Sequence, residues 1–182
     1  MKLYEHILDG SIHIQRNFFE QKIYDKMCKE IPKLKYIPDH QPASMYFGNR
    51  FQAWPVNEYT WNKYRKIIID KLEKILGCRI QVSEDGIKMR KMITSEILKS
   101  KTNTKYALIH NDHCEFAAVM PFYQSVSGGT AFFEYTVDKY PDIEIGAYPN
   151  RLIIYHGKRL HASCQDFTFK NTYKLNIFFN KA

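Results

Sequence analysis

The fold of this chain is most constrained by the order of its segments, which is two helical stretches followed by many short strand-like runs. Residues 18–31 and 61–76 each place apolar side chains on one helical stripe, and they are followed by Pro32 and Gly77, residues that end helices. After Gly77, Gly, Pro, Asn and Asp separate short apolar or alternating runs, which is typical of a sandwich or barrel. These runs cover residues 87–93, 106–113, 115–123, 130–137, 151–156, 160–164 and 173–179.

The sequence therefore predicts an α+β chain that forms one domain over residues 1–182. Its length suits a single domain, and it contains no internal repeat or Gly/Ser-rich linker. We expect residues 1–84 to be a mainly helical support and residues 85–180 to be a β-rich core. The N-terminal helices should pack on one face of a sheet.

Composition narrows the possible partners and compartments. The net charge is +8, but the lysines are scattered and form no basic block, so a nucleic-acid partner is not expected. The N-terminal segment has no continuous apolar run, and no stretch is long enough to cross a bilayer, so we predict no membrane association and a cytoplasmic location. The cysteines lack C-x-x-C spacing, which favours reduced thiols over a disulfide framework or a structural zinc site; they are Cys28, Cys78, Cys114 and Cys164.

The segment ALIHNDHCEF carries the clearest chemical signal. In a strand, residues two apart point to the same face, so His110 and Asp112 would offer an imidazole and a carboxylate to one metal ion. A histidine from a distant strand would complete a set of two His and one carboxylate, which suits Fe(II) oxygenases. The H-x-D pair alone is a weak signal, because chance gives roughly one in every three chains of this composition.

Four motifs in a fixed order give this pair its context. They are H-N-D at 110–112, G-G-T-A-F at 128–132, R-L-I-I-Y…L-H-A within 151–162, and K-L-N-I-F-F at 174–179. With these motifs, residues 85–180 resemble the 2-oxoglutarate- and Fe(II)-dependent dioxygenase superfamily, and within it the prolyl-4-hydroxylase-like branch.

The resemblance implies a double-stranded β-helix, also called a jelly roll or cupin-like core. It implies Fe(II) held by His110, Asp112 and His161, with 2-oxoglutarate and O2 as cosubstrates. Such an enzyme oxidises its substrate, usually by hydroxylation, and releases succinate and CO2. The substrate would be a peptide or protein side chain, an amino acid or a small metabolite. Asp112 favours hydroxylation over halogenation, because the family's halogenases lack that carboxylate.

The resemblance also implies residues that hold the cosubstrate. The family usually binds the distal carboxylate of 2-oxoglutarate with Arg on the last core strand, but this chain has Lys174 there, with Lys170 as the alternative. A lysine ammonium keeps the positive charge, but it cannot make the two parallel hydrogen bonds that an arginine guanidinium makes to a carboxylate. Tyr123 is a second candidate contact.

Other residues near these motifs have simpler interpretations than metal binding. His156 competes with His161 for the distal ligand position, but it falls at the end of a strand where a turn begins. His113 would face away from the His110–Asp112 pair. Gly128 and Gly129 are interpreted as a turn, and residues 36–55 and 93–104 are candidate lids.

Three alternative functions remain. One is a non-catalytic jelly-roll binding module, for which the metal would be dispensable. Another is an AlkB-type nucleic-acid demethylase, although such enzymes carry two arginines on the last strand segment and residues 174–182 contain none. A hydrolytic metalloenzyme is the third. The sequence makes no prediction of oligomeric state.

Overall fold

The computed structural model describes residues 2–38, 48–53, 59–83, 86–94, 105–136, 140–164 and 171–182. Among these residues, three α-helices lie in the first half of the chain: α1 (Leu3–Leu8), α2 (Gln21–Glu30) and α3 (Tyr59–Leu76). A short 3-10 helix, η1 (Ile31–Lys33), follows α2. Helices α2 and α3 confirm the two predicted helical segments, whereas α1 was not predicted. Gly77 ends α3 with a φ of +71°, as expected for a glycine just past a helix.

Helix α2 begins three residues later than the apolar pattern predicts. Phe18 and Phe19 are buried but lie before the helix. The side-chain Oδ1 of Asn150 accepts a hydrogen bond from the Phe19 backbone N at 2.8 Å, and Asn150 Nδ2 donates to the Phe19 O at 2.8 Å. Because both backbone groups of Phe19 bond to Asn150, Phe19 stays outside the helix, and helical hydrogen bonding starts only beyond it.

The strands of the described residues form two antiparallel sheets. The larger has the order β1-β9-β6-β11-β5-β3-β2, with β4 paired to β11, and the smaller has the order β10-β7-β8. The strands are β1 (His13–Arg16), β2 (Ile37–Pro38), β3 (Gly48–Ala53), β4 (Ile80–Gln81), β5 (Ile87–Thr94), β6 (Phe116–Pro121), β7 (Ser125–Phe132), β8 (Ile143–Ala147), β9 (Arg151–His156), β10 (His161–Cys164) and β11 (Asn171–Lys181).

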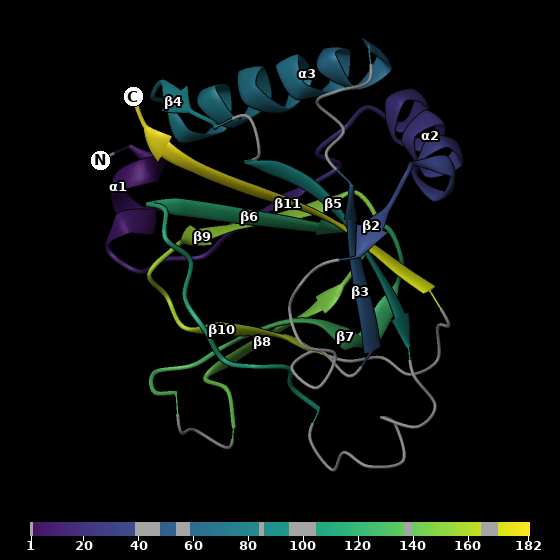
Figure 1. The fold of residues 1–182 in the computed structure, drawn as a ribbon. Helices are drawn as coiled ribbons and strands as arrows, with labels where there is room; N and C mark the ends of the chain where they lie inside the picture. Colours follow the sequence, from purple (N-terminus) through teal and green to yellow (C-terminus); the bar gives the residue numbers. More distant parts are fainter. Residues whose placement is uncertain are drawn as a thin grey trace.

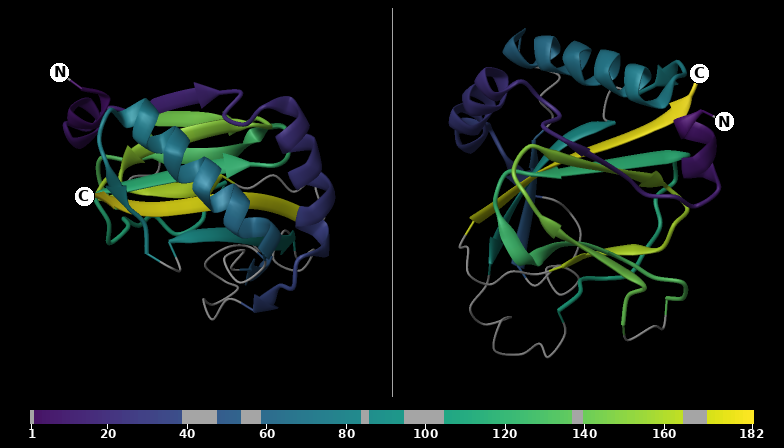
Figure 2. Two further views of the ribbon diagram at one scale, coloured as in Figure 1. Left: turned by 90° about the horizontal axis from the view of Figure 1, so that it is seen from above. Right: turned by 180° about the vertical axis from the view of Figure 1, so that it is seen from behind.

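The helices cover one face of the larger sheet, and the smaller sheet lies against its other face (Figures 1 and 2). On β11, Leu175, Ile177 and Phe179 are buried in the core that contains the helix residues Met27, Ile68 and Leu72. The alternate residues Lys174, Asn176 and Phe178 line the space between the two sheets. The predicted packing of the N-terminal helices on one sheet is therefore confirmed. The opposite face of that sheet borders a cavity between the two sheets.

The N-terminal part contributes strands that the sequence analysis did not predict. Strands β1, β2, β3 and β4 all come from the first 84 residues, and β3 pairs with β5 along six residues of each strand. Their signals are weak: β1 and β4 are only four and two residues long, and each is added to the edge or end of a longer strand. Strand β8 was likewise not predicted.

The predicted strand at residues 106–113 is wrong. In this segment only Tyr106 and His110 form isolated bridges, to Cys164 and His161. Beyond His110 the chain no longer pairs with β10. Instead, the Asp112 backbone N donates to the O of Gly157, in the turn after β9, at 2.8 Å. His110 and Asp112 are therefore brought together by a turn contact and not by strand alternation.

The predicted turn at Gly128 and Gly129 is also wrong, because both residues lie inside β7. The pairing of β7 with β8 shifts register between Ser125 and Gly129, as at a β-bulge. Gly129 has a φ of +133°, and a Cβ there would lie 2.1 Å from the Ile145 carbonyl oxygen. Glycine is thus required by close strand approach and a positive φ within the strand.

Candidate metal centre

His110 and His161 are brought side by side by their backbones. The His110 N donates to the His161 O at 3.0 Å, and the His161 N donates to the His110 O at 2.9 Å. Residues that exchange both hydrogen bonds in an antiparallel pair place their side chains on the same face. Their imidazole centroids are accordingly 4.5 Å apart.

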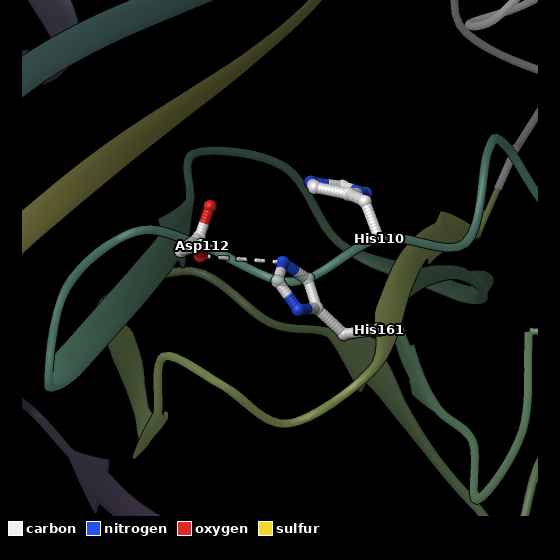
Figure 3. A group of neighbouring side chains, drawn as sticks. All are labelled: His110, Asp112 and His161. Atoms are coloured by element: carbon white, nitrogen blue, oxygen red, sulfur yellow. Dashed lines mark ion pairs between the residues drawn. The ribbon is translucent and has the colours of Figure 1, made fainter.

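Asp112 joins this pair from the turn that follows. Its Oδ2 lies 3.5 Å from His161 Nε2, and potential ligand atoms of His110, Asp112 and His161 all lie within 4.8 Å of one another. Figure 3 shows the three side chains converging on one point. The turn packs tightly there, since a Cβ on Gly157 would lie 2.2 Å from the Cys114 carbonyl oxygen. Gly157 therefore permits the approach that positions Asp112.

Hydrogen bonds orient both imidazoles for metal binding. His110 Nδ1 lies 2.9 Å from the Leu108 carbonyl oxygen, and His161 Nδ1 lies 2.9 Å from the Arg159 carbonyl oxygen. A carbonyl can only accept, so each Nδ1 carries the proton and each Nε2 presents a lone pair. Backbone carbonyls thus hold both rings in the tautomer that a metal ligand needs.

Asp112 carries an oxygen that accepts no hydrogen bond from the described residues. Its Oδ2 is buried, and no hydrogen-bond donor in the described part of the chain satisfies it. A buried carboxylate oxygen in this state is costly, and a bound cation would compensate that cost. Two imidazoles and one carboxylate therefore fit a divalent iron site with open coordination positions.

The surroundings keep the nearby groups neutral. Burial lowers the pKa of His161, an effect that the Asp112 carboxylate opposes and His110 reinforces. The Tyr155 ring on β9 lies 4.8 Å from the His161 ring, centroid to centroid. Burial, and then the Asp112 charge, raise the pKa of Tyr155. The neutral imidazole is the form that binds a metal, and Tyr155 remains a neutral phenol beside it.

A cavity between the two sheets adjoins the three residues. Lys174 is half-buried in its wall, and Lys174 Nζ donates to the Gly129 carbonyl oxygen on β7 at 3.3 Å. The described lining residues are Arg50, Arg90, Lys91, Met92, His110, Asp112, Val119, Thr130, Tyr155, His161, Ser163, Thr172, Lys174, Asn176 and Phe178. The structure therefore joins the three candidate ligands and Lys174 in one space.

The other predicted site residues lie elsewhere. Tyr123 follows the end of β6 and is not among the residues described as lining this cavity, so its role stays a prediction. His156 ends β9, as predicted, and lies outside the three-residue cluster. His113 is exposed and borders a second hollow. Lys170 and most of the candidate lids, at 39–47, 54–55 and 95–104, lie outside the described residues.

Sequence reasoning missed Arg50, Arg90 and Tyr155. Arg90 and Arg50 lie on β5 and β3 and line the cavity. The alternation in I-K-M-R-K-M (87–92) places Lys88, Arg90 and Met92 on one face. A polar face of this kind ordinarily indicates the solvent-exposed side of a sheet. Here it is a cavity wall because the smaller sheet covers it.

No protein-family model matches this chain, and no curated protein sequence matches it. Solved structures do match. The epimerase SnoN from nogalamycin biosynthesis, a non-haem α-ketoglutarate-dependent enzyme, superimposes with a TM-score of 0.70 at 10% identity, covering 98% of this chain and 83% of that one. This chain has the fold of the 2-oxoglutarate- and iron-dependent oxygenases.

Two further structures of this fold extend the comparison. A Pseudomonas putida prolyl-4-hydroxylase has a TM-score of 0.58 at 11% identity, over 99% of this chain and 97% of that one. HygX from Streptomyces hygroscopicus, solved with nickel, 2-oxoglutarate and hygromycin B, has a TM-score of 0.66 at 8% identity, over 98% and 86% of the two chains. The oxygenase fold includes the N-terminal helices, since the likeness spans nearly the whole chain.

A membrane-spanning helix is not found among the described residues.

Proposed function

We propose that this protein is an Fe(II)- and 2-oxoglutarate-dependent oxygenase, with His110, Asp112 and His161 as the metal ligands. The observation that carries the proposal is the hydrogen bonding of the three candidate ligands. Both Nδ1 atoms are engaged by carbonyls, and the buried Asp112 Oδ2 has no hydrogen-bond partner. A structural cluster of polar side chains would satisfy these atoms internally, whereas a metal centre leaves them directed at the ion.

The iron would supply the redox chemistry, and the protein residues would bind and orient the reactants. One 2-oxoglutarate and one O2 would react with a substrate C–H group to give succinate, CO2 and the hydroxylated product. One oxygen atom would enter succinate and the other the product. The retained carboxylate at Asp112 favours hydroxylation or a related oxidation over halogenation.

Lys174 is the proposed partner of the distal carboxylate of 2-oxoglutarate. It lies on the wall of the same cavity as the three ligands, and Thr130, Ser163 and Thr172 add hydroxyl groups to that wall. Tyr123, just past the end of β6, is the proposed second contact. Lys170 is the alternative cation, on the segment that precedes β11.

We further infer that the two sheets form a double-stranded β-helix and that residues 1–182 act as one oxygenase domain. The facing antiparallel sheets and the near-complete coverage of the oxygenase structures support this topology. The substrate would be a peptide side chain, an amino acid or a small metabolite, as the varied chemistry of the similar structures suggests. A cytoplasmic location is part of the same proposal.

Turnover of 2-oxoglutarate tests the proposal. Purified protein with Fe(II), 2-oxoglutarate and O2 should release succinate slowly even without its substrate, and Asp112→Ala and His161→Ala should not. Exclusion of O2 should stop succinate release in the wild type. Release that continues in both variants, or without added iron, would assign the activity to a contaminant and remove the support for this function.

A further inference from the structure

Asn176 places an amide on an interior strand of the larger sheet, in the wall of the cavity. It lies on β11, which pairs on one side with β6 and on the other with β5. Its direct neighbours across the strands are Val119 and Lys88. Asparagine is depleted in strands, where β-branched and aromatic side chains pack better. The amide on this face of β11 therefore calls for a reason other than packing.

The hydrogen bonding of Asn176 supports such a reason. Its Oδ1 is buried and accepts no hydrogen bond from the described residues. Buried polar side-chain atoms nearly always have a partner, so an exception in a cavity wall points to a ligand that binds there. An amide carries both a donor and an acceptor, and a half turn exchanges them without a change of shape. Asn176 can therefore donate to an acceptor group in the cavity.

Strand β11 leads from Lys174 toward the metal centre. At its start, Lys174 Nζ donates to the carbonyl oxygen of Gly129 on β7 at 3.3 Å. Near its end, Asn180 Oδ1 accepts a hydrogen bond at 2.9 Å from the backbone N of Glu115, three residues beyond Asp112. The strand thus begins at the smaller sheet and ends beside the segment that carries Asp112.

Asn176 lies between these two points. It is two residues beyond Lys174 on the same face of β11, and Phe178, two residues further, borders a second hollow together with Asp112. Residues two apart on a strand are separated by roughly 7 Å. The five-carbon chain of 2-oxoglutarate is of similar length, so a molecule that joins Lys174 to the metal centre would pass beside Asn176.

We propose that the Asn176 amide donates a hydrogen bond to the keto-acid end of 2-oxoglutarate, the end that would face the metal. This inference rests on the proposed function, because it adds a residue to the cosubstrate site of the same cavity. Lys174 would hold the distal carboxylate, and Asn176 would hold the opposite end of the molecule. Since the amide is neutral, it would orient the keto acid without adding charge to the site.

The test is an anaerobic optical titration of the full chain with Fe(II) and two keto acids. One is 2-oxoglutarate, and the other is 2-oxobutyrate, which has the same keto-acid end but lacks the distal carboxylate. The charge-transfer band of each chelate reports its dissociation constant without turnover. Asn176→Leu removes the amide and keeps a side chain of similar size. We expect this variant to raise both dissociation constants roughly tenfold.

Comparison variants assign the effect to the amide. Lys174→Gln should weaken 2-oxoglutarate and leave 2-oxobutyrate unchanged, because only 2-oxoglutarate has a distal carboxylate. Asn176→Asp replaces the donor with a negative charge, so it should weaken both keto acids at least as much as Asn176→Leu. Asn62→Leu is the matched control, since Asn62 is exposed on α3 and is not among the residues that line the cavity. Zn(II) affinity should be unchanged in Asn176→Leu, which also reports that the variant folds.

The outcomes separate the two proposals. If Lys174→Gln weakens 2-oxoglutarate but Asn176→Leu binds both keto acids as the wild type does, the role of Asn176 is refuted and the oxygenase proposal stands. If Asn176→Leu weakens 2-oxoglutarate alone, or binds Zn(II) more weakly, Asn176 acts on the distal carboxylate or on the metal centre, and the inference is overturned. If the wild type gives no band with either keto acid, the proposed function fails, and this inference fails with it.

Discussion

His110 and His161 exchange both of their backbone hydrogen bonds, at 3.0 and 2.9 Å, although they come from segments far apart in the chain. This single bridge sets the spacing of the two imidazoles, and the contact of the Asp112 N with Gly157 O adds the carboxylate. The candidate metal centre thus depends on backbone contacts that its side chains do not make, so its ligands can be tested separately from the fold.

Asp112→Ala should separate metal binding from stability. The wild-type protein should gain about 2.7 kcal/mol in unfolding free energy when Zn(II) is supplied at 100 times its dissociation constant. The variant should gain almost none of this. Without metal, Asp112→Ala should be at least as stable as the wild type, because it removes a buried oxygen that lacks a hydrogen-bond partner. Denaturant unfolding with and without Zn(II) measures both effects, and a large loss of stability in the metal-free variant would contradict this interpretation.

Lys174→Ala should weaken 2-oxoglutarate and leave metal affinity unchanged. Loss of one charged hydrogen bond to a carboxylate corresponds to roughly a tenfold to hundredfold rise in the dissociation constant. Lys174→Arg should keep part of the affinity because the charge remains. Lys66→Ala is a control, since Lys66 is 77% exposed and pairs with Asp70 on the surface. Equal 2-oxoglutarate affinities for wild type and Lys174→Ala would transfer the role to another cation.

Gly129→Ala should destabilise the smaller sheet severely. The added Cβ would meet Ile145 O at 2.1 Å, and the residue would keep a φ of +133°. We expect a loss of more than about 3 kcal/mol in unfolding free energy. Gly77→Ala is the matched control: its φ is also positive, at +71°, but its nearest neighbour is the Lys2 side chain at 3.7 Å. That variant should lose only about 1–2 kcal/mol. Similar losses in the two variants would argue against close approach as the cause.

Asn150→Ala should detach the segment before α2 from the end of the larger sheet. The variant leaves both backbone groups of Phe19 without their partner and places alanine at a φ of 54°. The expected loss is about 2–4 kcal/mol in unfolding free energy. Asn150→Gly loses the same hydrogen bonds without the backbone strain, so it should be about 1 kcal/mol more stable than Asn150→Ala. Thermal and denaturant melts would measure the difference, and wild-type stability in both variants would exclude this role for Asn150.

The sequence predicted which three side chains lie together better than it predicted the local geometry that places them. Strands β5, β9, β10 and β11 were found because apolar runs and turn residues mark them clearly, and the motif order indicated which histidine would join His110 and Asp112. The assumed strand at 106–113 was wrong because a backbone contact to Gly157, distant in sequence, shapes that segment. Gly128 and Gly129 appeared to form a turn because close strand approach and a turn both require glycine.

The basic cavity wall could not be inferred from the residues alone. Lys88 and Arg90 on β5, and Lys174 and Asn176 on β11, alternate with apolar residues as they would on a solvated sheet face. The packing of the smaller sheet over that face converts it into a lined cavity, and this packing is a property of the tertiary structure.

The most direct test of the metal centre is an anaerobic optical titration of metal-free protein with Fe(II) and 2-oxoglutarate. When the keto-acid chelates iron, a weak visible charge-transfer band forms. We predict this band in the wild type only when Fe(II) and 2-oxoglutarate are both present, and no band in Asp112→Ala. A folded wild-type protein that binds neither and gives no band would contradict the oxygenase account and favour a binding module in which His110, Asp112 and His161 are structural.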